Sequence, residues 1–417
     1  MENLSDNLEN KEIIMAAITG EDKPGLTSRL AGIIAQYGAT ILDIGQADIH
    51  NSLSLGIMFI SDQSQSGNIL KEMLFSSSEM GVQVRFAPVS IAEYEKWVSM
   101  QGKNRYIVTL LGRKISAALI ADVSKVLAEQ SLNIDAITRL TGRIPLSGDG
   151  AAQKLTRACV EMSVRGTPKD KSLLQSEFMR LSREQGYDIS FQEDNLYRRN
   201  RRLICFDMDS TLIQTEVIDE LAMRAGVGDQ VKAITESAMR GEIDFCESFK
   251  RRVSLLKGLD ESVMREIAQN LPITEGAERT LKILKQYGYK IAILSGGFNY
   301  FGNYLKQKFN LDFVYANELE IVDGKLTGNY VGEIVDGKRK AELLKLIAQI
   351  ENLNLQQVIA VGDGANDLPM LNCAGLGIAF HAKPKVKENA KQSISSIGMD
   401  GVLYMLGFKD SYIEEKK

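Results

Sequence analysis

Two carboxylates stand two positions apart at the end of a short apolar run, and this feature constrains the fold more than any other. The run covers residues 203–206 and leads into Asp207, Met208 and Asp209. Continuous apolar runs of this length are typical of central strands in a parallel sheet, and ligands bind just beyond the carboxyl ends of such strands. Two carboxylates placed there repel each other unless a cation neutralises them or one is protonated. This suits Mg2+ beside a nucleophilic carboxylate, and a solvated Asp turn is the alternative.

A second apolar run ends in small residues. Residues 290–294 lead into Ser295, Gly296 and Gly297. A hydroxyl and backbone N–H groups at a strand end suit an oxyanion. A tight glycine turn explains the segment equally well.

A third apolar run again carries carboxylates to its end. Residues 358–361 lead into a Gly-Asp-Gly-Ala-Asn-Asp segment that contains Asp363, Asn366 and Asp367. Its glycines allow close approach of the backbone. Between the second and third runs, Lys340 lies where a helical pattern begins. A lysine at this position interacts unfavourably with the helix dipole, so it often binds an anion. A solvated lysine is the alternative.

In this order the DxDST, SGG, Lys and GDGxND segments resemble the haloacid dehalogenase superfamily of phosphotransferases. Residues 200–408 resemble its phosphoserine phosphatase family more closely. Glu216 follows Asp207 by nine positions, and residues 245–253 resemble the substrate-gripping helix of that family. The resemblance implies an α/β fold with a Rossmann-like parallel sheet, covered by a small helical cap over about residues 217–275.

The resemblance also implies the catalytic roles. Asp207 would attack phosphorus and form an aspartyl phosphate. Asp209 would protonate the leaving serine oxygen and then take a proton from the hydrolytic water, which requires a raised pKa. Mg2+ would bind the carboxylates of Asp207 and Asp363 and the backbone carbonyl of Asp209.

Substrate contacts follow from the same resemblance. The phosphoryl oxygens would be held by Ser295, the Gly296 amide and Lys340. Asn366 would touch substrate or phosphate, and Asp367 would orient Lys340 or the groups around the metal.

The cap is expected to select the substrate. By resemblance, Glu216 would pair with the ammonium of phosphoserine and Arg252 with its carboxylate. Met239 and Phe245 would form an apolar lid that excludes bulk water. A solvated helix face for Arg252 and an ordinary core position for Met239 are the alternatives.

The amino-terminal half has a different organisation. Residues 12–90 and 104–192 each show the β-α-β-β-α-β order of ferredoxin-like α+β domains. They resemble tandem ACT domains, a small amino-acid-binding regulatory fold. Asp22 and Gly25 lie in a turn that matches the ACT ligand turn, whereas residues 112–116 lack its Pro-Gly pair. We expect L-serine as an effector and a homodimer formed through exposed sheet edges, and modules that serve only dimerisation are the alternative.

Length, charge and composition argue against several other classes of protein. A chain of 417 residues suggests about three domains, and its net charge of −4 argues against a general nucleic-acid surface. It contains no apolar run long enough for a bilayer, and its acidic start is unlike a secretory signal, so we expect no membrane partner and a cytoplasmic location. Two histidines argue against a histidine metal site or a Ser-His-Asp triad.

The resemblance therefore implies a phosphoric monoester hydrolase. It would convert O-phospho-L-serine to L-serine and phosphate, the last step of L-serine biosynthesis. Another small phosphomonoester, such as phosphothreonine or phosphohomoserine, is the nearest alternative substrate. An amino-acid-sensing regulator with an inactive phosphatase domain is disfavoured, because Asp207, Asp209, Lys340 and Asp363 are all present.

Overall fold

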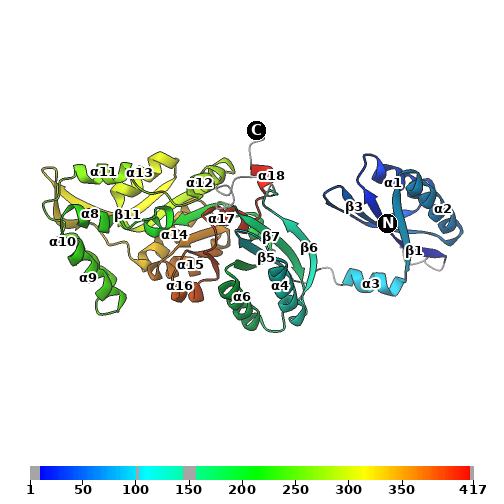
Figure 1. Ribbon diagram of the computed structural model, residues 1–417, viewed down its shortest axis with the longest axis horizontal. Coiled ribbons are helices and arrows are strands. Elements are labelled where there is room, and N and C mark those ends of the chain that lie inside the picture. Colours follow the sequence, from blue (N-terminus) through cyan, green and yellow to red (C-terminus); the bar gives the residue numbers. More distant parts are fainter. Residues whose placement is uncertain (1–9, 100–101, 103, 144–155, 414–417) are drawn as a thin grey trace. The chain divides into compact units, whose positions relative to one another are not determined.

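The computed structural model describes residues 10–99, 102, 104–143 and 156–413. The chain divides into two compact units, Met1–Lys103 and Asn104–Lys417 (Figure 1). The second unit holds both the second ferredoxin-like module and the carboxyl-terminal α/β domain.

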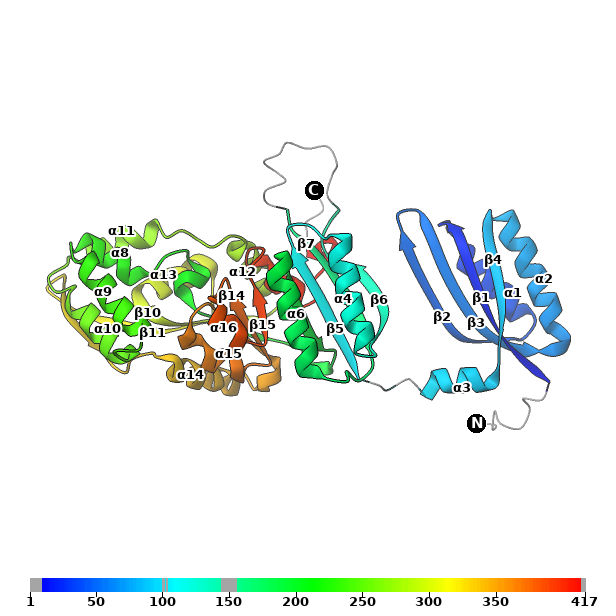
Figure 2. The same cartoon turned by 60° about the horizontal axis from the view of Figure 1, so that its bottom comes forward.

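The first unit is an antiparallel sheet covered on one face by two helices. Its elements are β1 (Lys11–Glu21), α1 (Leu26–Gln36), β2 (Thr40–Ile49), β3 (Ser52–Asp62), α2 (Gln63–Glu79), β4 (Val82–Val89) and α3 (Ile91–Ser99). The strand order is β2-β3-β1-β4, and α1 and α2 lie side by side against the sheet (Figure 2). Apolar residues that alternate along β1 and β3 face these helices, as period-two patterning requires.

The second module repeats this arrangement. Its elements are β5 (Arg105–Gly112), α4 (Ala117–Glu129), β6 (Asn133–Arg139), β7 (Ala158–Arg165), α6 (Lys171–Gln185) and β8 (Asp188–Glu193). The strand order β6-β7-β5-β8 corresponds strand for strand to that of the first unit. Both modules therefore have the expected ferredoxin-like topology.

The carboxyl-terminal domain is built on a sheet of seven strands in the order β12-β11-β10-β9-β13-β14-β15. These strands are β9 (Leu203–Phe206), β10 (Lys290–Phe298), β11 (Phe313–Val322), β12 (Lys325–Val331), β13 (Val358–Gly362), β14 (Leu376–Phe380) and β15 (Gln392–Ile394). All pairings are parallel except that of β11 with β12. The expected fold class is thus confirmed.

The central strands are buried on both faces, which explains their unbroken apolar sequences. On β9, Ile204 and Phe206 enter one core, whereas Leu203 and Cys205 enter the other. The first core receives α12 (Ala277–Gln286), α13 (Asn299–Phe309) and α17 (Asp400–Met405). The second core receives α14 (Gly337–Ile350) and α15 (Leu368–Cys373). Helices on both faces are the general solution for a parallel sheet.

A helical insertion follows β9, where the cap was expected. It comprises α8 (Val217–Arg224), α9 (Gly228–Met239), α10 (Phe245–Ser254) and α11 (Ser262–Gln269). Helix α10 packs on β12, with the rings of Phe249 and Tyr330 edge to face at 5.5 Å. The β11–β12 hairpin was not foreseen from the sequence.

The second module packs directly against the carboxyl-terminal domain. Arg113 forms two hydrogen bonds of 2.8 Å with the carboxylate of Glu275. The basic segment before β9, residues 198–202, also contributes to this interface. Its first residue, Arg198, is buried and pairs with Glu161 of the second module at 2.7 Å.

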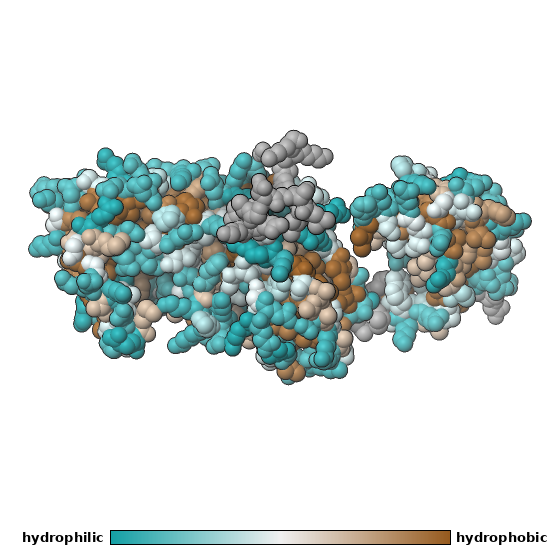
Figure 3. Space-filling model, in the orientation of Figure 1, coloured by the Kyte–Doolittle hydropathy of each residue, from teal (hydrophilic) through white to brown (hydrophobic). Residues whose placement is uncertain are grey.

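The outer surfaces of the two modules include exposed edge strands. Ile137 on β6 is 55% exposed, and apolar residues gather over this edge in Figure 3. The corresponding strand of the first unit, β2, exposes Ile41, Ile44 and Ile49. Among the described residues, no helix is both long and apolar enough to cross a membrane.

Candidate active site

The three sequence motifs converge because their strands are neighbours. Strand β9 lies between β10 and β13, with Phe206 in register with Ile293 and Val361. Asp207, Ser295 and Asp363 therefore emerge at the same edge of the sheet, at the carboxyl ends of adjacent strands. Ser295 and Asp207 are buried, and Asp363 is half-buried.

Lys340 lies at the centre of these groups and is completely buried. Its Nζ is 2.9 Å from Asp207 Oδ1 and 2.7 Å from Asp367 Oδ1. Burial alone would lower the pKa of Lys340, but the charges of Asp207 and Asp367 outweigh it and raise the pKa. The lysine is thus held as a cation between two carboxylates, which is the only arrangement that makes its burial tolerable.

The two oxygens of Asp207 have different surroundings. Oδ1 accepts hydrogen bonds from Lys340 and from the Met208 amide at 2.7 Å. No described residue donates to Oδ2. The carboxylate is therefore fixed in position through one oxygen, while the other is available to react.

Asp209 is buried next to Asp207, and its Oδ1 has no hydrogen-bond partner among the described residues. Burial, followed by the charges of Glu216 and Asp207, raises the pKa of Asp209 well above its usual value. A Cβ atom on Gly297 would lie 2.6 Å from Asp209 Oδ2, so a side chain at position 297 has no room. This environment favours a protonated carboxyl group that can donate its proton.

Three carboxylates form a group that fits a divalent cation. Oxygens of Asp207, Asp363 and Asp367 lie within 4.8 Å of one another. Burial and the charge of Asp207 raise the pKa of Asp363 to about 7, so the group resists full ionisation without a counter-charge. Asp367 already accepts from Lys340 and from the Gly364 amide through its two oxygens. Asp207 and Asp363 are consequently the freer ligands.

The Ser-Gly-Gly segment is folded tightly around the end of β10. The Gly297 amide donates to Ser295 Oγ at 3.0 Å. The Gly296 carbonyl accepts from Asn317 Nδ2 at 2.8 Å, and Asn317 Oδ1 accepts from the Val335 amide. Asn317 therefore fixes the peptide that joins the two glycines.

Glu216 directly precedes α8, Arg252 lies on α10, and the two side chains interact electrostatically. Glu216 Oε1 accepts from Ser210 Oγ at 2.8 Å. Ser210 has a left-handed backbone with φ of 55°, which turns the chain back toward the start of α8. Burial lowers the pKa of Arg252, and the charges of Glu216 and Asp219 oppose this effect. The site thus presents one anionic and one cationic group beside the catalytic carboxylates.

The two expected lid residues differ in position. A Cβ atom on Gly296 would lie 3.0 Å from the ring of Phe245, so that ring covers the Ser-Gly-Gly segment. Met239 is 64% exposed at the end of α9, and its Sδ is 3.9 Å from Lys383 Nζ. In this arrangement only Phe245 covers the segment at the end of β10.

The remaining predicted residues are Asn366 and the turn that contains Asp22 and Gly25. Asn366 is half-buried, and its backbone packs against the start of α14, where a Cβ atom on Gly337 would lie 2.5 Å from its carbonyl oxygen. Asp22 and Gly25 lie in the separate first unit, in the exposed turn before α1. Gly25 has φ of 91° and has open space beside it.

Sequence reasoning assigned no role to three polar residues that complete the site. Thr211 Oγ1 donates to Asp363 Oδ1 at 3.0 Å, Ser210 holds Glu216, and Asn317 holds the glycine peptide. The two hydroxyl residues belong to the motif after β9, so their position was a usable signal. Asn317 lies far from every motif and gave none.

Comparisons with known proteins identify the families of the three domains. A haloacid dehalogenase-like hydrolase model matches residues 201–375, and ACT domain models match residues 12–87 and 105–192. A crystal structure of a probable phosphoserine phosphatase from Vibrio cholerae, in an unliganded form, superposes with a TM-score of 0.58 and 34% identity. That superposition covers 75% of this chain and 89% of the other.

Curated relatives extend the similarity along the whole chain. The chain is 37% identical over 406 residues to phosphoserine phosphatase SerB2 of Mycobacterium tuberculosis, covering 97% of this chain and 95% of that protein. It is 47% identical over 247 residues to the phosphoserine phosphatase of Archaeoglobus fulgidus, covering 59% of this chain and 71% of the relative. With this similarity over nearly its full length, its haloacid dehalogenase-like domain and its two ACT domains, the chain belongs to the phosphoserine phosphatase family of haloacid dehalogenase-like hydrolases.

Proposed function

We propose that this chain hydrolyses O-phospho-L-serine to L-serine and phosphate. The observation that carries the proposal is the contrast between two neighbouring carboxyl groups. Asp207 is held by Lys340 through one oxygen, whereas Asp209 is buried with an oxygen that lacks a partner. A fixed anion beside a group that favours protonation suits nucleophilic attack coupled to proton donation.

The reaction proceeds in two steps on these residues. Asp207 attacks phosphorus, the bond to the serine oxygen breaks, and Asp209 gives its proton to that oxygen. Water then attacks the aspartyl phosphate, Asp209 takes the proton, and phosphate leaves. Lys340, Ser295 and the Gly296 amide stabilise the charge that develops on the phosphoryl oxygens.

A divalent cation, proposed as Mg2+, fits the carboxylate group described above. The carboxylates of Asp207 and Asp363 and the backbone carbonyl of Asp209 would hold it, since hard cations prefer oxygen ligands. When bound, it supplies neutralising charge between nucleophile and phosphate. Thr211 keeps Asp363 oriented through its hydrogen bond.

Selection of phosphoserine rests on Glu216 and Arg252. Their opposite charges match the ammonium and the carboxylate of an amino acid, and Phe245 covers the segment beside them. Phosphothreonine and phosphohomoserine carry the same two groups, so they remain the alternative substrates.

We also propose a regulatory ligand and a mode of assembly for the ACT domains. The open turn at Asp22 and Gly25 supports L-serine as an effector of the first ACT domain. The exposed apolar edges of β2 and β6 support a homodimer. Four free cysteines suit the reducing cytoplasm, where the enzyme would act.

Phosphate release from L-phosphoserine tests the proposal. Wild type should be active with Mg2+ and inactive after EDTA treatment, and Asp207→Asn should be inactive. An active Asp207→Asn variant, or an EDTA-treated enzyme at full rate, would overturn the mechanism.

The substrate assignment has its own test. Arg252→Ala should raise KM for phosphoserine far more than KM for p-nitrophenyl phosphate. Arg251→Ala is the matched control, because Arg251 lies on the same helix, is exposed and pairs with Glu247. Equal effects of both variants on both substrates would remove Arg252 from substrate recognition.

A further inference from the structure

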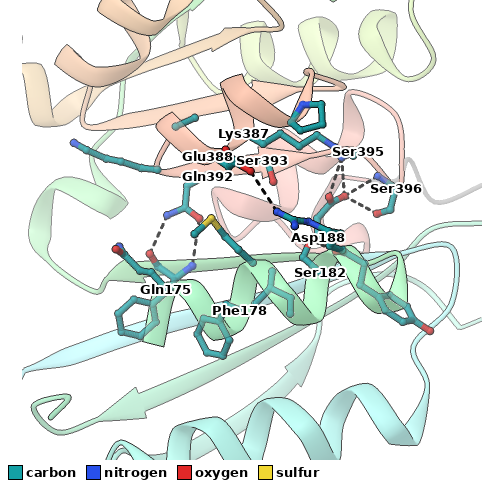
Figure 4. A pocket seen from close by; sticks show the side chains of 18 of the residues that line it. Gln175, Phe178, Ser182, Asp188, Lys387, Glu388, Gln392, Ser393, Ser395 and Ser396 are labelled. Carbon is teal, nitrogen blue, oxygen red and sulfur yellow. Dashed lines mark hydrogen bonds and ion pairs between the residues drawn. The ribbon is translucent and has the colours of Figure 1, made fainter. Parts of the chain in front are cut away.

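A cavity of about 520 Å3 lies between the second ACT domain and the phosphatase domain (Figure 4). One wall is formed by α6 and β8, and the other by α16 (Pro384–Asn389), β15 and the residues after it. The cavity is within the usual range for small-molecule sites, roughly 300–1,000 Å3, and such sites often occur at domain interfaces.

The domains close firmly on both sides of this cavity. The Gln392 side chain pairs with the backbone of Phe191, accepting from its N–H and donating to its C=O. The buried carboxylate of Asp188 accepts from the amides of Ser395 and Ser396. The gap between these contacts is therefore held open by the fold.

The cavity is lined by cationic groups that form few contacts with carboxylates of the protein, although the charge of Lys387 acts on Asp188. Lys387 and Lys391 line it, and neither forms an ion pair with any described residue. Arg183 is already paired with Glu388 across the cavity at 3.4 Å. The Ser395 hydroxyl is buried at the wall without a hydrogen-bond partner among the described residues. Among the described residues, Lys391 therefore has no carboxylate in an ion pair, and the Ser395 hydroxyl has no hydrogen-bond partner.

The wall formed by α6 and β8 has an apolar patch among its polar residues. Phe178 and Met179 of α6 and Ile189 of β8 supply this patch. We propose that the cavity binds a small organic monoanion whose carboxylate meets Lys387 and Lys391 and whose apolar body packs on α6. A phosphate dianion fits less well, because the carboxylates of Asp188 and Glu388 also line the cavity.

This site is connected to the cap. Lys383 directly precedes α16, and its Nζ is 3.9 Å from Met239 Sδ at the end of α9. A ligand bound to Lys387 therefore contacts α16, and the residue that precedes this helix, Lys383, contacts α9 of the cap. Occupancy changes KM for phosphoserine through this contact, a consequence that rests on the proposed function.

Calorimetry on the full-length enzyme without substrate tests the site independently of catalysis. The probes are 3-phenylpropionate, the neutral 3-phenylpropanol, inorganic phosphate and L-serine. Wild type should bind the carboxylate at least about tenfold more tightly than the alcohol, a difference that corresponds to one charge-assisted contact. Phosphate and L-serine should not compete with it.

Variants locate the binding. Lys387→Ala/Lys391→Ala should weaken binding about tenfold or more, and Met179→Trp should do so by filling the apolar side. Lys385→Ala on the same helix, outside the cavity, should leave it unchanged. Lack of binding to wild type would overturn the site, and so would wild-type affinity in both the double variant and Met179→Trp. A probe that shifts KM equally in wild type and the double variant would overturn the coupling.

Discussion

Gly297 gives the sharpest test of how the buried carboxyl group is positioned. A Cβ atom there would lie 2.6 Å from Asp209 Oδ2, and ordinary contact begins at 3.4 Å. Gly297→Ala therefore requires a displacement of about 0.8 Å, shared between the backbone and the Asp209 side chain. Met208 Cε would also lie 2.9 Å from the new atom, so the added methyl group meets a second side chain.

A misplacement of about 1 Å at a catalytic group can cost roughly 100-fold in rate. We expect kcat for phosphoserine to fall by about that factor, which corresponds to roughly 2.7 kcal/mol in the activation barrier. KM should change little, because Glu216 and Arg252 do not contact position 297. Initial rates of phosphate release across a range of substrate concentrations separate the two parameters.

Gly302→Ala is the matched control. A Cβ atom on Gly302 would lie 2.7 Å from Val314 Cγ1, an overlap of the same size in α13, away from the catalytic carboxylates. Both variants should lose about 1–3 kcal/mol of unfolding free energy from overpacking, measured in urea. Only Gly297→Ala should lose kcat. If the two variants kept similar kcat values, the close fit around Asp209 would have no catalytic meaning.

Three further predictions concern charged groups. Lys340→Met leaves buried carboxylates without their cation, so urea titration should show a loss of about 3–5 kcal/mol, and an unchanged midpoint would contradict this. Burial raises the pKa of Asp188 above 3.8, so the folded state binds more protons than the unfolded state as pH rises from that value. Its contribution to stability is therefore complete below pH 3.8 and is lost as pH rises through the folded pKa, a slope that should be absent from melting curves of Asp188→Asn. Arg113→Ala removes an ion pair with Glu275 that is more than one-third exposed, so melting should show a cost of at most about 1 kcal/mol.

The catalytic end of the sheet was predictable because two independent signals agree there. Unbroken apolar runs mark strands buried on both faces, and the polar residues that follow each run mark the edge where those strands end. The convergence of Asp207, Ser295 and Asp363 follows once the strands are neighbours. Lys340 was found because its position at a helix start is unfavourable unless an anion lies nearby.

Other parts of the site depend on tertiary contacts that leave no local pattern. Asn317 is one of several polar residues in β11, and its structural role comes from a hydrogen bond to Gly296, 21 positions earlier in the chain. The β11–β12 hairpin has the period-two pattern of any strand pair, which does not indicate that it extends a parallel sheet. The left-handed backbone of Ser210 is likewise set by the packing around it.

The duplicated modules illustrate how similar folds acquire different uses. In the first module the turn before α1 is exposed, and Gly25 has open space beside it. In the second module the corresponding segment carries Arg113, which forms its two hydrogen bonds with Glu275 of the phosphatase domain. Because this turn contacts the phosphatase domain, it is less able to bind a ligand. We therefore expect an effector site of the second module at another position. The cavity beside α6, which Lys387 and Lys391 line, is where we propose that a ligand binds.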